Sequence, residues 1–183
     1  QLTFECILPA IAGPDYYEDF WAGRAEPTDP EITEVLAEIL FLRCGPRPEV
    51  VCAGYFNADT DSIDWAPGVK LLAEGRAAMA PMGDWAKGYL EGEGLVADED
   101  FGVVPFPGTA GTFVFTTDTF PLPKGAPNRA GAIALLRSFA TADDQVAFNA
   151  IKGSIPARSD VDLGDFPDAF DSMHRATAAA FQR

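Results

Sequence analysis

The segment around residues 77–92 restricts the possible folds more than any other part of this chain of 183 residues. A helical pattern ends at Gly75, a short apolar run occupies residues 77–80, and a new helical pattern begins at Trp85 after a glycine. Short apolar runs bounded by glycine are typical of buried strands and tight turns. The segment predicts a strand, a turn and a helix, with Trp85 near the carboxyl end of the strand, where α/β proteins bind ligands.

Helical patterns alternate with short apolar runs along the rest of the chain. Helices are expected at residues 4–22 with a break at Gly13 and Pro14, from a capping box and proline at 28–31 to Gly45, at 65–74, from Asn128 to 139, from Thr141 to Gly153, and at 166–181. Further strands are expected at residues 101–105 and 112–120, and residues 154–162 are expected to be extended. This alternation, without an internal repeat, predicts the α/β class.

Composition and charge exclude several classes of function. The chain has 13 Lys and Arg against 28 Asp and Glu, a formal net charge of −15, and its basic residues are scattered, so nucleic acid is excluded as a partner. The apolar stretches are too short to span a bilayer. A single histidine and the lack of a Cys-x-x-Cys pair argue against a zinc site, and no motif predicts a cofactor. Cys44 and Cys52 can close a small disulfide, typical of an oxidising compartment, or remain ordinary thiols.

Five short motifs follow one another in a fixed order along the chain. They occupy residues 77–89, 101–109, 118–126, 145–149 and 152–158. In this order they resemble the solute-binding proteins of ABC sugar importers, specifically the glucose/mannose-binding branch of the extracellular solute-binding family that also contains the maltose-binding proteins. The resemblance covers roughly residues 1 to 162.

The resemblance implies a periplasmic-binding-protein-like fold, in which two α/β lobes close on a monosaccharide such as glucose, galactose or mannose. It implies a protein without enzymatic activity that works in the periplasm or another extracytoplasmic space and delivers its ligand to an ABC permease in the membrane. No signal-peptide pattern opens the chain, and it resembles an internal piece of such a protein. Residues 1–118 match mostly the second lobe, residues 119–158 match a segment of the first lobe, and residues 159–183 match a helix that returns towards the second lobe.

Three residues become candidate sugar ligands through the resemblance. Trp85 is expected to stack on the apolar face of the sugar, for which a flat and partly polar indole is well suited; the alternative is a buried tryptophan that packs a helix on a sheet. Asp118 is expected to accept hydrogen bonds from two neighbouring hydroxyls, or else to cap a turn. Lys152 is expected to donate to hydroxyls, although a lysine at a helix end is also favoured by the helix dipole alone.

Other polar and aromatic residues have simpler explanations. Asp84 is expected to cap the helix that follows it, and Trp21 and Trp65 are expected in the core. His174 lies in a polar helical pattern and is expected to be solvated.

Two alternatives from other functional classes remain open. One is a glycosidase that pairs Asp118 with Glu5 or Asp84, because such enzymes need two carboxylates about one bond. The other is an interaction module with exposed apolar patches that favour self-association.

Overall fold

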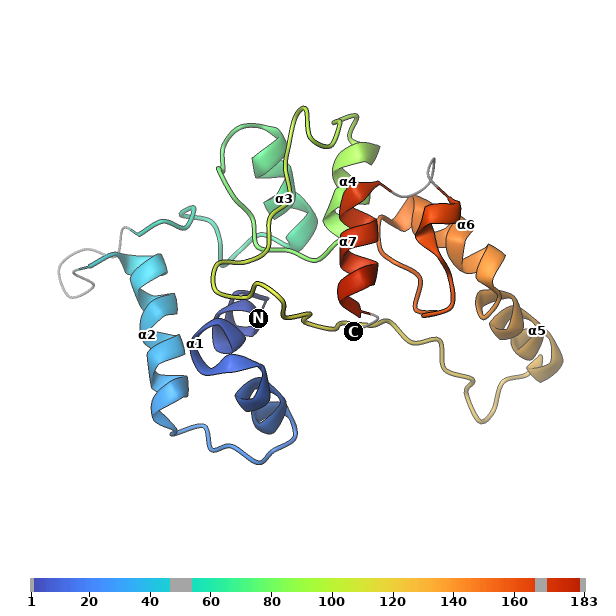
Figure 1. Ribbon diagram of the computed structural model, residues 1–183, viewed down its shortest axis with the longest axis horizontal. Helices are drawn as coiled ribbons and strands as arrows, with labels where there is room; N and C mark the ends of the chain where they lie inside the picture. Colours follow the sequence, from blue (N-terminus) through green and yellow to red (C-terminus); the bar gives the residue numbers. More distant parts are fainter. Residues whose placement is uncertain (1, 47–53, 167–170, 182–183) are drawn as a thin grey trace. The chain divides into compact units, whose positions relative to one another are not determined.

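The computed structural model describes residues 2–46, 54–166 and 171–181, and the regular structure of these residues is helical (Figure 1). The helices are α1 (Leu2–Trp21), α2 (Pro30–Cys44), α3 (Trp65–Ala73), α4 (Trp85–Gly92), α5 (Arg129–Phe139), α6 (Ala142–Lys152), the short 3₁₀ helix η1 (Leu163–Asp165) and α7 (Ser172–Phe181). None of the helices in this part of the chain is both long and apolar enough to cross a membrane.

The chain forms two compact units. The first consists of Gln1–Gly83 and Leu95–Val114, and the second consists of Asp84–Gly94 and Phe115–Arg183. Each unit has a hydrophobic cluster of its own: Ile7, Leu8, Ile32 and Val35 in the first, and Val146, Val161, Leu163 and Ala178 in the second.

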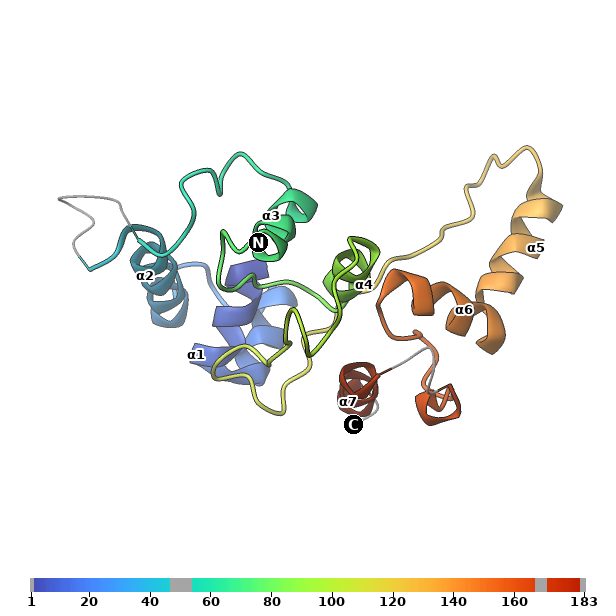
Figure 2. The same ribbon diagram turned by 90° about the horizontal axis from the view of Figure 1, so that it is seen from above.

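Helices α1 and α2 lie side by side and supply the core of the first unit (Figure 1 and Figure 2). The predicted break in α1 is confirmed, because Gly13 has a left-handed φ of 83° and ψ of 166° just before Pro14. A hydrogen bond of 2.9 Å from the Tyr16 hydroxyl to Asp29 joins α1 to the start of α2. The predicted capping box is wrong, because Asp29 rather than Thr28 holds the N-cap position and its carboxylate makes no cap bond.

The helices of the second unit begin and end where local signals predict. Asn128 and Thr141 cap α5 and α6 with side-chain hydrogen bonds, and Gly153 ends α6 in the left-handed conformation, with a φ of 84°. The inward face predicted for α6 is only partly correct, because Val146 is buried whereas Ala147 and Ala150 are exposed.

The predicted strands are wrong. Residues 77–80, 101–105 and 112–120 contain no strand, and the described residues contain only an isolated bridge between Ala97 and Phe101. A strand is stabilised by hydrogen bonds to a neighbouring strand, which an apolar composition alone does not supply. Phe115 and Phe120 instead make ring contacts with α7 and α5, with centroid distances of 5.5 Å to Phe181 and 4.7 Å to Phe139. The α/β class is therefore not confirmed for the described residues.

The sequence also gave expectations for two tryptophans and one cysteine. Trp21 and Trp65 are 53% and 42% exposed, so their predicted core positions are wrong. Both lie at helix ends, where part of a large ring stays in solvent. Cys44 is buried, and the possible Cys44–Cys52 disulfide includes Cys52, which lies outside the described residues.

Candidate ligand-binding site

The site is built where the start of α4 meets the end of α6, within the second unit. Gly88 of α4 contacts the backbone at the end of α6 so closely that a Cβ atom there would lie 2.6 Å from the Lys152 carbonyl oxygen. Gly153 faces the same contact, and a Cβ atom on it would also lie 3.5 Å from the Trp85 carbonyl oxygen. Two glycines thus allow two backbones to touch, and they bring Trp85 and Lys152, two of the three predicted ligands, to one junction.

The structure joins the other predicted ligand to this junction. The Lys152 ammonium lies 3.2 Å from Oδ2 of Asp118 and forms an ion pair with it, although the two residues are 34 positions apart. The side chains are 34% and 76% exposed, so both can reach a ligand from solvent. Trp85 is half-buried as the first residue of α4, which leaves part of its indole accessible.

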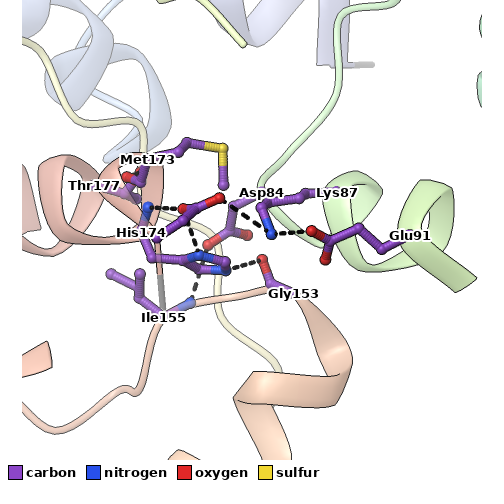
Figure 3. A network of polar contacts seen from close by, with 9 residues as sticks. Asp84, Lys87, Glu91, Gly153, Ile155, Met173, His174 and Thr177 are labelled. Carbon is purple, nitrogen blue, oxygen red and sulfur yellow. Dashed lines mark hydrogen bonds and ion pairs between the residues drawn. The ribbon is translucent and has the colours of Figure 1, made fainter. Parts of the chain in front are cut away.

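Asp84 does not cap α4, in contrast to the prediction. It holds the N-cap position, but its side chain makes no bond to the first turn of the helix. Oδ2 instead accepts a hydrogen bond of 3.1 Å from the Ile155 backbone N–H, in the turn that follows α6 (Figure 3). The sequence could not reveal this bond, because its partner is 71 residues away.

A buried polar network surrounds the same turn (Figure 3). The Lys87 side chain is only 7% exposed and forms ion pairs with Glu91 at 2.5 Å and with Asp171 at 3.3 Å. The prediction that His174 is solvated is wrong, because its side chain is 3% exposed. Its Nδ1 lies 2.9 Å from Asp171 Oδ1 and its Nε2 lies 3.2 Å from the Gly153 carbonyl oxygen. The network fastens α7 to both α4 and α6.

The charge state of Asp171 favours its contacts with Lys87 and His174. Partial burial acts to raise the pKa of Asp171, but it is outweighed by hydrogen bonds from the His174 backbone and ring and by the charge of Lys87, so the pKa is lowered. Asp171 is therefore a carboxylate at neutral pH. The local signals for the network were the spacing of Lys87 and Glu91 by four residues and of Asp171 and His174 by three.

A second concave region of the unit is separate from these residues. A cavity of about 350 Å³ is lined by residues 159–164 together with Arg175, Ala178 and Ala179. It contains none of the three predicted ligands. Among the described residues, no group of three or more His, Cys, Asp and Glu side chains is arranged to hold a metal ion.

The junction of α4 and α6 has the chemistry of a binding site for a polar solute: a partly accessible indole, a carboxylate and an ammonium group.

The family model for bacterial extracellular solute-binding proteins matches residues 51–146, which is more than half of the chain. The chain belongs to this family. The predicted resemblance is confirmed at the level of the family.

Several relatives match most of the chain. An uncharacterized ABC transporter extracellular-binding protein of Pyrococcus horikoshii is 38% identical over 174 residues, which is 95% of this chain and 36% of the relative. The xylose/arabinose-binding protein XacG of Haloferax volcanii is 28% identical over 88% of this chain and 33% of its own length. A probable sugar-binding periplasmic protein of Mesorhizobium japonicum is 34% identical over 89% and 37%. The chain spans about a third of the length of these curated relatives.

Proposed function

We propose that this chain is part of the solute-binding component of an ABC sugar importer and contributes to a site for a monosaccharide such as glucose, galactose or mannose. The family and the relatives described as sugar-binding proteins support this proposal. The protein then works in the periplasm or another extracytoplasmic space, and its membrane partner is an ABC permease.

The observation that carries the proposal is the ion pair between Asp118 and Lys152 beside the helix that begins with Trp85. A carboxylate accepts hydrogen bonds and an ammonium group donates three, so together they match both functions of neighbouring sugar hydroxyls. The C–H groups on one face of a pyranose ring pack on an indole, while the hydroxyls at the ring edge stay free for polar partners. The three residues thus cover the apolar and the polar side of one sugar.

In the whole protein the sugar lies between two lobes, with the division proposed above for residues 1–118, 119–158 and 159–183. A ligand that binds the closed state better shifts the equilibrium towards closure. The hinge motion is then the signal that the permease detects. The lobe that faces Trp85 supplies the further hydroxyl contacts that select one sugar.

The test is a calorimetric titration of the chain with glucose, galactose, mannose, xylose and arabinose, with tryptophan fluorescence recorded in parallel. Trp85→Ala is expected to weaken binding at least about tenfold, because an aromatic stacking surface is lost. Trp21→Ala is the matched control, since it removes another partly exposed indole that lies in the first unit and is expected to leave the affinity unchanged.

Each negative result has a distinct meaning. A folded chain that gives no saturable signal with any of the five sugars contradicts sugar binding by this chain. An affinity that is the same for the wild type and Trp85→Ala, with binding present, places the site elsewhere.

A further inference from the structure

The turn that follows Lys152 is held at two points by side chains from outside α6 (Figure 3). Asp84 accepts a hydrogen bond of 3.1 Å from the Ile155 N–H, and Nε2 of His174 lies 3.2 Å from the Gly153 carbonyl oxygen. Gly153 and Ser154 are buried, and Ile155 is half-buried. Buried backbone groups need partners, so these two side chains supply what α6 cannot supply beyond its own end.

The Asp84 bond connects two segments that each carry a predicted sugar ligand. Asp84 immediately precedes Trp85, and Ile155 follows Lys152 by three residues. The contact between Gly88 and the Lys152 carbonyl brings the two backbones together one helical turn further along α4. The segments are therefore fixed at two separate points, which restricts their rotation about each other as well as their separation.

We propose that Asp84 is a positioning residue of the sugar site: its carboxylate accepts the Ile155 N–H and so holds Lys152 at the distance from Trp85 that sugar binding needs. This inference rests on the proposed function. The bond also accounts for an aspartate at the start of α4 that makes no cap bond to that helix. Small displacements of positioned groups weaken a site out of proportion to the contact that is lost.

Two substitutions separate positioning from helix capping. Asp84→Ser keeps a side chain that is well suited to an N-cap, but its hydroxyl is too short to reach the Ile155 N–H. Asp84→Asn keeps an oxygen at the same distance and can still accept this hydrogen bond. Positioning predicts that Asp84→Ser weakens sugar binding roughly tenfold and that Asp84→Asn restores most of the affinity. Capping alone predicts little change for Asp84→Ser.

The experiment compares the wild type, Asp84→Ser, Asp84→Asn and the control Asp143→Ala. For each protein it measures the affinity for the sugar that binds best and the rate of hydrogen exchange of the Ile155 amide. Asp143 is an exposed aspartate in the first turn of α6, at the end remote from Lys152. We expect faster Ile155 exchange together with weaker binding in Asp84→Ser, and neither change in Asp143→Ala. A merely structural role would speed up the exchange and lower the melting temperature without changing the affinity of the folded protein.

The outcomes distinguish this inference from the proposal on which it rests. If the wild-type chain binds no sugar, the proposed sugar binding by this chain fails and the inference fails with it. If the wild type binds and Asp84→Ser binds equally well, only the inference is overturned. If Asp84→Ser does not fold, Asp84→Asn decides, because loss of binding in a folded Asp84→Asn that retains Ile155 protection also overturns it.

Discussion

At the scale of single residues, the Asp118–Lys152 ion pair is expected to matter for binding and little for folding. Ion pairs between exposed side chains contribute about 0–1 kcal/mol to the free energy of unfolding. A hydrogen bond from a charged group to a ligand contributes more, enough to change an affinity about tenfold or beyond. We therefore expect Asp118→Asn and Lys152→Met each to weaken sugar binding about tenfold or more while the urea midpoint changes little.

The control for this pair is Arg24→Met. Arg24 forms an ion pair with Asp19 at 2.7 Å, with side chains 61% and 51% exposed, in the first unit of the chain. Losing the Arg24–Asp19 ion pair tests whether breaking any exposed ion pair changes the affinity for sugar. Equal affinities for the wild type and both site variants would exclude Asp118 and Lys152 as ligands.

The family resemblance suggested these candidate ligands, and local sequence signals did not define the partners of the residues around them. The structure brings Asp118 and Lys152 together as a pair, as a shared role requires. The predictions for Asp84 and His174 are wrong: their partners Ile155 and Gly153 are 71 and 21 residues away, although His174 also contacts Asp171, three residues before it. A helix cap was the simplest local explanation for Asp84. Only the folded chain shows that its carboxylate accepts the Ile155 N–H instead.

At the scale of elements, the contact between α4 and α6 depends on Gly88. We expect Gly88→Ala to destabilise the second unit by about 1–3 kcal/mol, the usual range for overpacking a close contact. The added methyl group would lie 2.6 Å from the Lys152 carbonyl oxygen, and the obstructing atoms are backbone atoms that cannot rotate away. Urea denaturation followed by circular dichroism measures the change.

Gly92→Ala is the matched control, because Gly92 also belongs to α4 and a Cβ atom there would meet no atom within 4 Å. Alanine is favoured over glycine in a helix by about 0.5–1 kcal/mol, so this variant is expected to be slightly more stable than the wild type. If the two alanine variants had the same stability, the close approach of α4 and α6 would be wrong.

The elements show why sequence patterns predicted helices and failed for strands. The caps Asn128 and Thr141 and the terminating Gly153 lie within a turn of the bonds that they make, so the ends of α5 and α6 could be read locally. The run at residues 112–120 has the composition of a strand, but a strand needs a partner distant in sequence. Its phenylalanines found aromatic partners on helices instead.

At the scale of the whole molecule, the ordered motifs identified the family, whereas the division into lobes remains a prediction. The five motifs lie in several different elements between residues 77 and 158, so recognising the family does not depend on assigning any one element correctly. The net charge of −15 is likewise a property of the whole chain. Its self-repulsion weakens as the pH falls and carboxylates become protonated, which by itself favours the folded state in mild acid.

The Asp171 network is expected to act in the opposite direction. The pKa of Asp171 is lower in the folded chain than the ordinary aspartate value of about 3.9. A lowered folded pKa means that the carboxylate contributes stability above the ordinary value, and that this contribution is lost as the pH falls through the folded pKa. We therefore expect the stability of the second unit to decline below about pH 4, with α7 released from Lys87 and Gly153.

Asp171→Asn separates this local effect from the global charge. Self-repulsion is nearly the same in both proteins, so the difference between their urea midpoints from pH 7 to pH 3 isolates the carboxylate. We expect Asp171→Asn to be less stable than the wild type at pH 7 and the difference between their urea midpoints to shrink as the pH falls below about 4.

Asp160→Asn is the control. Hydrogen bonds from Arg158 lower the pKa of Asp160, but the Asp160 side chain is 64% exposed and water screens the pair. The midpoint difference between the wild type and Asp160→Asn should therefore be smaller. A midpoint difference for Asp171→Asn that stays constant across the range would show that the carboxylate charge does not hold α7 in place.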